Sequence, residues 1–280
     1  MSKADLHLHS VQSDGSCTRE EILRRAVQLG LTHLSFTEHD DTRFASQAAS
    51  LGRQFGLWVL PGVEISAFDK ALGKRAHILG YLYRSTAAIT SVCAPVLRRR
   101  HENCLWQIEQ LQRLGYRITA QDVLPYAAGG TLYKQHIYHY LLDSGQSEAL
   151  FGRVKQELFS HGGPCDRRIE YPDPREAVAA IRADGGFAVL AHPGQQQNFA
   201  LLPDLVDAGL SGIELCHLSN SPSDRLQIRA LAKQYGLFCT GGSDFHGIYE
   251  EGRDQLGICL APEDCPLPAL ADTPGDDLAF

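Results

Sequence analysis

Short apolar segments alternate with amphipathic ones in the first 90 residues of the chain. Period-two or continuous apolar patterns predict four strands, over Ala4–His9, His33–Thr37, Leu57–Glu64 and Ala76–Tyr83. The first strand is followed by a predicted helix, which Thr18 and Glu21 begin as a capping box and which Gly30 ends. The amino-terminal third therefore predicts an alternation of strands and helices.

The same alternation returns near Pro174. The predicted helices are Pro174–Ala183, Leu201–Ala208 and Ser223–Tyr235, and the strands that follow them are Phe187–Ala191, Gly212–Cys216 and Leu237–Thr240. Strands joined through helices pair in parallel with right-handed crossovers. The two regions together therefore predict an α/β fold in which seven parallel strands form a barrel.

No strand pattern appears between residues 91 and 165. Helical periodicity there covers Val96–Leu114, Lys134–Leu142 and Glu148–Ser160. We expect residues 1–90 and 166–262 to form the β/α barrel, with residues 91–165 inserted as a helical subdomain that packs over its mouth. Residues 263–280 are a C-terminal tail rich in Pro and Asp, which we expect to be loosely ordered.

Nine histidine and acidic residues fall almost entirely at the carboxyl ends of the predicted strands. They are His7, His9, Asp14, His39, Glu64, His77, His192, Asp244 and His246. His7 and His9 are two residues apart in a strand, so their imidazoles project from the same face. In a closed parallel barrel the carboxyl ends converge on one rim, where such barrels carry their chemistry. Imidazoles and carboxylates together suit zinc, iron or manganese, so the sequence predicts a metal centre at this rim.

The composition narrows the class of partner. The 280 residues include 44% hydrophobic and 21% charged residues, as in an ordinary soluble enzyme, and carry a formal net charge of -7. A negative chain argues against binding to long nucleic acid through a basic face. A small phosphorylated substrate stays possible, because bound metal ions reverse the local charge. No apolar run approaches the length of a membrane span, so we expect no membrane partner.

The eight cysteines are scattered, and no two of them form a Cys-x-x-Cys pair. We expect free, buried thiols, which pack as small apolar side chains, and hence a reducing, cytoplasmic location. The first predicted strand begins within a few residues of Met1, so we expect no signal peptide.

Six motifs give the chain a resemblance to a known family. They are Asp5-Leu6-His7-Leu8-His9-Ser10, Ser13-Asp14-Gly15, Thr37-Glu38-His39-Asp40, Pro61-Gly62-Val63-Glu64, Ala191-His192-Pro193-Gly194 and Gly242-Ser243-Asp244-Phe245-His246. In this order they resemble the PHP (polymerase and histidinol phosphatase) family, most closely its stand-alone members that act on nucleotides and short RNA ends. The resemblance implies a distorted seven-stranded (β/α)7 barrel with a helical insertion, and a metal-dependent phosphoric ester hydrolase.

The resemblance also implies three divalent metal positions, for manganese, iron or zinc. One would be bound by His7, His9, Glu64 and Asp244, a second by Glu64 as a bridge with His77 and His192, and a third by Asp14, His39 and His246. A hydroxide bridging two ions would attack phosphorus, because metal binding lowers the pKa of water from 15.7 to about 7. Two residues have a structural alternative: His77 as a core histidine and Asp14 as a turn residue before Gly15.

The expected substrate contacts depart from the family pattern. Relatives carry an Arg where Lys134 stands, and a basic Arg-Gly-Lys stretch where this chain has His161-Gly162-Gly163. Those positions contact the substrate phosphate in relatives, and Lys offers a point charge in place of a bidentate fork. We consider Lys134 and His136 as substrate-binding residues, with Arg99 as a further phosphate contact. The alternative for Arg99 and its arginine neighbours is a solvated helix face.

Two residues near the predicted ligands are candidates for catalysis. Asp40 would orient a ligand imidazole or manage a proton, and His217, at a strand end, either lines the pocket or packs structurally. Three functions stay open. They are a phosphatase acting on a nucleotide mono- or bisphosphate or a similar small substrate, a phosphodiesterase acting on a cyclic phosphate or short oligonucleotide, and a non-catalytic regulatory metal-binding module. The complete ligand set favours the two enzymes.

Overall fold

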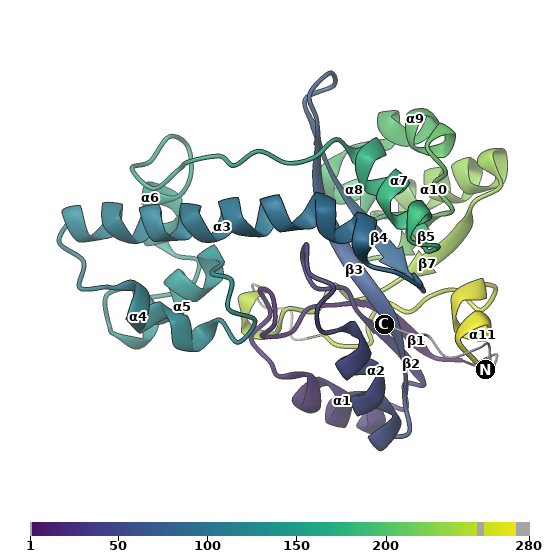
Figure 1. Cartoon of the computed structure of the whole chain (residues 1–280), viewed down its shortest axis with the longest axis horizontal. Helices are drawn as coiled ribbons and strands as arrows, with labels where there is room; N and C mark the ends of the chain where they lie inside the picture. The colour runs from purple at the N-terminus through teal and green to yellow at the C-terminus, as the bar shows by residue number, and fades with distance from the viewer. Residues whose placement is uncertain (1, 251–254, 273–280) are drawn as a thin grey trace.

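A computed structural model, which describes residues 2–250 and 255–272, contains a seven-stranded sheet whose strands lie side by side in chain order. The strands are β1 (Ala4–Leu8), β2 (His33–Phe36), β3 (Trp58–Asp69), β4 (Lys74–Tyr81), β5 (Phe187–Leu190), β6 (Gly212–Cys216) and β7 (Phe238–Gly241). The outer strands approach each other: Leu8 forms a β-bridge with Phe245, just after β7, and the Asp244 N–H donates to the His7 carbonyl at 2.8 Å. The predicted α/β barrel is therefore confirmed, as a nearly closed one (Figure 1).

One strand does not follow the parallel prediction. β1, β2 and β3 are parallel, as are β5, β6 and β7, but β4 is antiparallel to both of its neighbours. The reason is that β3 extends past Glu64 to Asp69, and a tight turn at residues 70–73 leads directly into β4 without a crossover helix. Because β4 runs backwards, its early residue His77 pairs with Ser66 and lies at the end of the barrel where the other strands finish.

Helices cover the outside of the barrel. They are α1 (Arg19–Gln28), α2 (Ala45–Gln54), α7 (Pro174–Ala183), α8 (Pro193–Gln196), α9 (Leu202–Asp207) and α10 (Pro222–Tyr235), with the 3₁₀ turn η2 (Phe199–Leu201). A further 3₁₀ turn, η3 (Gly247–Tyr249), follows β7 and contacts His139 of the inserted segment through Tyr249. The predicted capping box of Thr18 and Glu21 begins α1. The sequence pattern does not predict α2, because this helix has no side-chain cap and packs through small residues. A Cβ on Gly52 would lie 2.3 Å from Val59 Cγ2.

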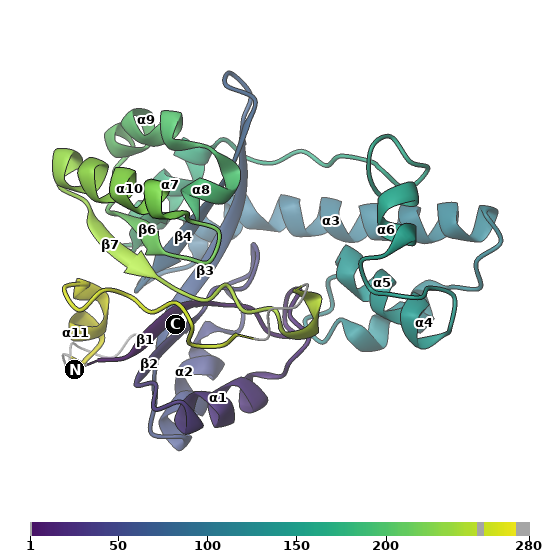
Figure 2. The same cartoon turned by 180° about the vertical axis from the view of Figure 1, so that it is seen from behind.

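A long helix leads out of the barrel into a group of short ones. α3 (Ala87–Arg113) is followed by α4 (Ala120–Val123), the 3₁₀ turn η1 (Leu124–Tyr126), α5 (Lys134–Asp143) and α6 (Arg153–Leu158), which project to one side (Figures 1 and 2). α3 begins before the predicted Val96, and its early residue Cys93 belongs to the barrel core. Farther along, Leu111 packs with Leu141 of α5 in a separate apolar cluster. The projecting helices thus have a core of their own.

Part of the C-terminal tail is ordered, and the loose tail predicted for residues 263–280 is wrong there. Residues Pro266–Asp272 form α11, and Leu267 is completely buried in an apolar cluster with Leu6 and Tyr81. Burial of this leucine fixes the helix against the barrel. The tail prediction for residues 273–280 lies outside the described residues.

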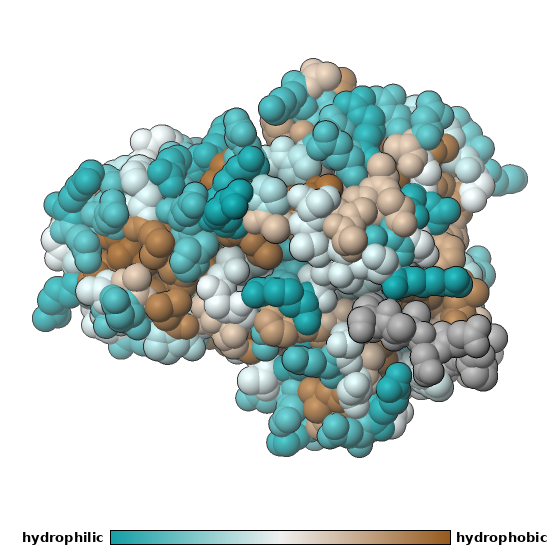
Figure 3. All heavy atoms as spheres, viewed as in Figure 1, coloured by the Kyte–Doolittle hydropathy of each residue, from teal (hydrophilic) through white to brown (hydrophobic). Residues whose placement is uncertain are grey.

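The described helices include none with the length and apolarity that a membrane span requires. On the face of the molecule in Figure 3, hydrophilic residues are widespread and hydrophobic residues gather in separate patches. Single exposed apolar side chains, such as Leu226 of α10, are ordinary on a protein surface.

Candidate metal centre

The nine predicted ligands come together at one end of the barrel. His7 lies in β1, Glu64 in β3 and His77 in β4, while the other six lie in segments that follow β1, β2, β5 and β7. The His77 side chain is 25% exposed, and those of the other eight are at most 13% exposed. The result is a buried polar cluster that is most open at His77.

Four of these residues surround one point. The Nε2 atoms of His7 and His9 lie 3.3 and 3.1 Å from Glu64 Oε2, and 3.2 and 3.1 Å from Asp244 Oδ1. Ions held by imidazoles and carboxylates have bonds of about 2.0–2.2 Å, so one ion between these atoms would reach all four. The group has the composition implied for the first metal position.

Glu64 is the centre of the whole cluster. Its Oε1 lies 2.7 Å from His77 Nδ1 and 3.0 Å from His192 Nε2, and its Oε2 lies 3.3 Å from His39 Nδ1. Because its two oxygens face different imidazoles, this carboxylate has the arrangement of a bridge between two neighbouring ions.

A third group surrounds Asp14. Its Oδ1 lies 3.5 Å from His246 Nε2 and 3.7 Å from His9 Nδ1, and its Oδ2 lies 3.8 Å from His39 Nε2. This group contains His9 in addition to the three residues that the family pattern implies. The rings of His9 and His39 each present one nitrogen to Asp14 and the other to Glu64, so the three groups are continuous.

Seven buried atoms of the nine residues have no hydrogen-bond partner among the described residues. One is His192 Nδ1, and the six that belong to the ligand groups above are His7 Nε2, His9 Nε2, Asp14 Oδ1, His39 Nδ1, Glu64 Oε2 and Asp244 Oδ1. A buried polar atom without a partner destabilises a fold, because it has lost its hydration and gained nothing in exchange. Divalent cations among these atoms would remove that cost, so the donor set fits bound metal ions.

Ion pairs between imidazoles and carboxylates hold the nine residues together. Burial opposes protonation of His9, but the carboxylates of Asp244 and Glu64, each 3.1 Å from its Nε2, outweigh burial and raise the pKa of His9 to about 10. Burial likewise opposes ionisation of Glu64, but the charges of His77, His39 and His7 hold the pKa of Glu64 well below its usual range. A metal ion bound here must therefore displace a proton from His9.

Metal binding should consequently release protons and strengthen with pH. Because the pKa of His9 is raised from its ordinary value of 6.5, protonated His9 stabilises the fold fully below pH 6.5. This stabilisation is lost as the pH rises through about 10. Competition with the proton therefore weakens as pH rises in this window. Because the pKa of His7 is raised as well, at least one proton must leave, and we expect affinity for Mn²⁺ to rise about tenfold or more per pH unit between roughly pH 7 and 9. Calorimetry in buffers of different ionisation enthalpy measures both the affinity and the protons released. A pH-independent affinity would contradict the His9 assignment.

Two buried carboxylates outside the nine support the site, and sequence reasoning did not assign either of them to it. Glu38 accepts hydrogen bonds from the hydroxyls of Ser10 at 2.5 Å and Ser13 at 2.6 Å, which fixes the loop after β1. Glu214 of β6 contacts His7 Nδ1 at 3.0 Å. The signal for Glu214 was a lone charged residue within an apolar strand, where a carboxylate needs a partner.

The backbone is strained at the site. Asp40, His192 and Asp244 have positive φ values of 58°, 24° and 53°. Such values are uncommon for residues with a side chain, and they persist where surrounding contacts hold them. Close packing also requires Gly242, because a Cβ there would lie 2.3 Å from His7 Cβ. The segment before Asp244 is therefore pressed against β1.

The two predicted catalytic residues have different surroundings. Asp40 accepts a hydrogen bond from Arg100 at 2.8 Å, where a ligand imidazole was expected. His217 Nδ1 accepts the Ser219 N–H at 3.0 Å, which leaves the proton of the neutral ring on Nε2, 3.3 Å from Asp244 Oδ2. His217 thus contacts a predicted metal ligand, and Asp40 holds an arginine.

The three predicted substrate contacts also differ. Lys134 is half-buried at the start of α5 and lines two cavities. His136 is completely buried, and its Nδ1 accepts the Tyr133 N–H at the beginning of α5. Arg99 donates to the Glu170 carbonyl at 3.2 Å. Of the three residues, only Lys134 lines any of the cavities described below.

The larger of these cavities, of about 590 Å³, is strongly basic. Its lining includes the cationic side chains Lys70, Arg75, Arg100, Lys134, Arg167 and Arg168, with the acids Asp166 and Glu170. Gln135 links this cavity to the predicted ligands, because it lines the cavity and donates to Asp14 Oδ2 at 3.0 Å. An excess of positive charge beside a cluster of metal ligands suits an anionic ligand. Lys134 and Gln135 also line the second cavity, of about 520 Å³, together with Glu250.

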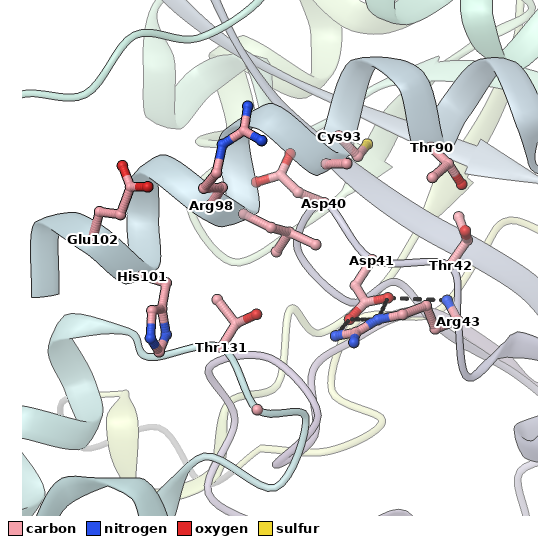
Figure 4. Close-up of a pocket in the computed structure, with 13 residues that line it drawn as sticks. Asp40, Asp41, Thr42, Arg43, Thr90, Cys93, Arg98, His101, Glu102 and Thr131 are labelled. Atoms are coloured by element: carbon pink, nitrogen blue, oxygen red, sulfur yellow. Dashed lines mark hydrogen bonds and ion pairs between the residues drawn. The ribbon is translucent and has the colours of Figure 1, made fainter. Parts of the chain in front are cut away.

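Another cavity, of about 420 Å³, is lined by a different stripe of α3 and by the loop after β2 (Figure 4). Cys93 and Arg98 lie on the helix side, and Asp41 binds Arg43 on the loop side at 2.6 Å. None of the nine predicted ligands lines this cavity or the two described above, but Asp40, next to His39, lines this one.

The chain aligns over most of its length with three named proteins. It is 44% identical over 247 residues to phosphoribosyl 1,2-cyclic phosphate 1,2-diphosphodiesterase of Eggerthella lenta. This alignment covers 88% of this chain and 94% of the relative. It is 29% identical over 268 residues to 3',5'-nucleoside bisphosphate phosphatase of Chromobacterium violaceum, with 91% and 90% covered. It is also 29% identical over 250 residues to 5'-3' exoribonuclease Rnm of Escherichia coli, with 86% and 84% covered.

The fold has close counterparts among solved structures. One from Bifidobacterium adolescentis, assigned as a metal-dependent phosphoesterase, superimposes with a TM-score of 0.85 at 28% identity and covers 94% of this chain and 93% of its own. An amidohydrolase from Chromobacterium violaceum gives a TM-score of 0.80 at 27% identity, with the same coverage. The family model described as PHP domain matches residues 5–155, more than half of the chain. With the 44% identical relative, this match shows that the chain belongs to the PHP domain family.

Proposed function

We propose that this protein is a metal-dependent phosphoesterase that hydrolyses a phosphate ester in a small substrate with a second phosphate group. The observation that carries the proposal is that two features are linked by one side chain. Buried ligand atoms without partners form the cluster, and Gln135 joins that cluster to a cavity with six cationic side chains. The phosphoesterase names of the relatives agree with this chemistry.

We propose three divalent ions, of manganese, iron or zinc, one in each group of ligands. When bound, such ions supply a nucleophile from water at neutral pH and neutralise charge on the phosphoryl oxygens. Glu64 would hold two positions together, and His217 would keep Asp244 oriented through its Nε2–H. Lys134 and Arg100 would bind anionic oxygens of the substrate in the basic cavity.

The names of two relatives suggest a role in binding for the second phosphate group of the substrate. Phosphoribosyl 1,2-cyclic phosphate and nucleoside 3',5'-bisphosphate both carry two phosphate groups, so one could meet the metal ions while the other occupies the basic cavity. The 44% identity favours the cyclic phosphodiester as first candidate, and the bisphosphate monoester is the second. The net charge of -7 favours such small substrates over the RNA of the exoribonuclease relatives.

A substrate panel tests the proposal. The manganese-loaded protein would be incubated with phosphoribosyl 1,2-cyclic phosphate, a nucleoside 3',5'-bisphosphate, a nucleoside monophosphate and short RNAs, with products followed by phosphorus NMR. We expect the highest kcat/KM for one of the two substrates with two phosphates. Turnover of none of them, by a protein that binds its metal, would favour the non-catalytic module.

The inserted helices should set substrate choice without contributing to metal binding. Lys134→Ala should lower kcat/KM about ten- to a hundredfold, the scale of one lost charged hydrogen bond of ~1.5–3 kcal/mol. Metal content should not change, because Lys134 is none of the nine ligands. Steady-state kinetics and elemental analysis check both parts, with Lys233→Ala on α10 as the control. Loss of metal in Lys134→Ala, or kinetics equal to those of the control, would remove Lys134 from the substrate site.

We also propose that the protein works in the cytoplasm. The seven cysteines other than Cys17 are free thiols, and five of them are buried. Free thiols persist in a reducing compartment, which supports this location.

A further inference from the structure

We propose that Glu214 is a positioning residue that fixes two metal ligands at once. The inference rests on the proposed metal centre. Glu214 lies in the middle of β6 and is completely buried. Its Oε1 lies 3.0 Å from His7 Nδ1, and its Oε2 accepts the backbone N–H of His192 at 2.8 Å. One carboxylate therefore links β1 to the segment that follows β5.

The contact with His7 decides which ring nitrogen can bind an ion. A carboxylate beside Nδ1 places the proton of the neutral imidazole there, and this leaves the lone pair on Nε2. His7 Nε2 is the atom that lies 3.3 Å from Glu64 Oε2 and 3.2 Å from Asp244 Oδ1. Glu214 thus presents His7 to the first group of ligands in the binding tautomer.

The contact with His192 holds a strained backbone. His192 has a φ of 24°, and this conformation aims its Nε2 at Glu64 Oε1, 3.0 Å away. Asn220 reinforces the arrangement, because its side chain donates to the Glu214 carbonyl at 3.0 Å and accepts the Gly194 N–H at 2.9 Å. The loop after β5 is therefore fastened to β6 on both sides of the ligand.

Glu64 and Glu214 hold the same two residues, His7 and His192, at different atoms. The rings of His7 and His192 are stacked, with centroids 5.6 Å apart and planes 22° apart. Their Nε2 atoms face the two oxygens of Glu64, whereas Glu214 holds Nδ1 of His7 and the main chain of His192. Glu214 therefore fixes the relative positions of two residues that are predicted ligands of different metal ions.

Only a carboxylate of this length satisfies both partners. Each partner presents an N–H, and a carboxylate accepts with both oxygens. The amide of Glu214→Gln accepts with its oxygen alone, so its NH₂ would face either the His192 N–H or His7 Nδ1. In the second case the amide would move the His7 proton to Nε2 and block the metal bond. Glu214→Asp keeps the charge but is one methylene shorter.

The test measures metal binding directly, without activity. Wild type, Glu214→Gln and Glu214→Asp would be depleted of metal and titrated with Mn²⁺ in a calorimeter, with ions per chain counted by elemental analysis. The matched control is Thr240→Val: Thr240 pairs with Glu214 in β7, is buried, and its hydroxyl has no hydrogen-bond partner among the described residues. We expect Mn²⁺ affinity to fall about ten- to a hundredfold in Glu214→Gln. Glu214→Asp should fall between it and wild type, and Thr240→Val should match wild type.

Each outcome decides a separate claim. If wild type binds no Mn²⁺, the proposed metal centre fails. If wild type binds Mn²⁺ and both Glu214 variants bind it as Thr240→Val does, the positioning role is overturned. Should Glu214→Gln fail to fold, Glu214→Asp decides alone, and wild-type affinity in that variant would overturn the role.

Discussion

Replacing Glu64 with glutamine should remove most of the phosphoesterase activity and part of the bound metal. The two carboxylate oxygens of Glu64 face imidazoles of all three ligand groups, at 2.7 to 3.3 Å. Glutamine keeps the volume, but it removes the negative charge and replaces one ligand oxygen with an NH₂ donor. Metal ions stabilise the charge of a phosphoryl transition state by several kcal/mol. A loss of about 4 kcal/mol corresponds to roughly a thousandfold in kcat.

Kinetics and elemental analysis of the same preparation would test this result. Asp184→Asn is a suitable control, because Asp184 is a buried carboxylate away from the cluster that accepts hydrogen bonds from the first turn of α3. We expect Asp184→Asn to change stability and leave the metal content as in wild type. Near-normal turnover and metal content in Glu64→Gln would show that Glu64 bridges no ions.

Replacing Arg100 with glutamine should damage both substrate binding and stability. Arg100 lines the basic cavity, donates to Asp40 at 2.8 Å and lies 4.9 Å from the ring centroid of Tyr133. Its Nε has no hydrogen-bond partner among the described residues and can donate to a ligand. Loss of a charged hydrogen bond to substrate should lower kcat/KM about ten- to a hundredfold. The unpaired Asp40 carboxylate should cost about 3–5 kcal/mol in the free energy of unfolding.

A second change separates the two effects. In Asp40→Asn/Arg100→Gln the buried charge is gone, so stability should recover while kcat/KM stays low. Arg99→Gln is the matched control from the next position of α3, and it also tests the substrate contact that the sequence suggested for Arg99. If Arg99→Gln weakens kcat/KM more than Arg100→Gln does, Arg99 is the substrate contact and Arg100 serves structure alone.

That the nine candidate ligands would gather at one end of the barrel was predictable, because the signal for it is chemical and positional at once. His7 and His9 share a strand face, and Asp244 and His246 directly follow the last strand, where a barrel gathers its side chains. Hydrophobic packing gives no reason for imidazoles and carboxylates at these points. Capping residues were predictable for the same reason, since Thr18 and Glu21 act locally on α1.

Features that depend on contacts distant in sequence were not predictable. Periodicity identifies β4 as a strand but says nothing about its direction, which the short turn after β3 decides. Likewise, sequence cannot tell which arginine of the α3 run faces the cavity, because that depends on how the helix rests on the barrel. Glu214 looks like an anomaly in an apolar strand until His7 is seen beside it.

The most direct test of the account is phosphate release by one preparation in metal-depleted and reloaded form. The substrate would be the best of the panel, and ions per chain would be counted after loading with manganese, iron or zinc. We predict no turnover in the depleted protein, and turnover that returns as occupancy rises to two or three ions per chain. Full activity in the depleted protein, or fewer than two ions per chain with every metal, would contradict a multinuclear, metal-dependent phosphoesterase.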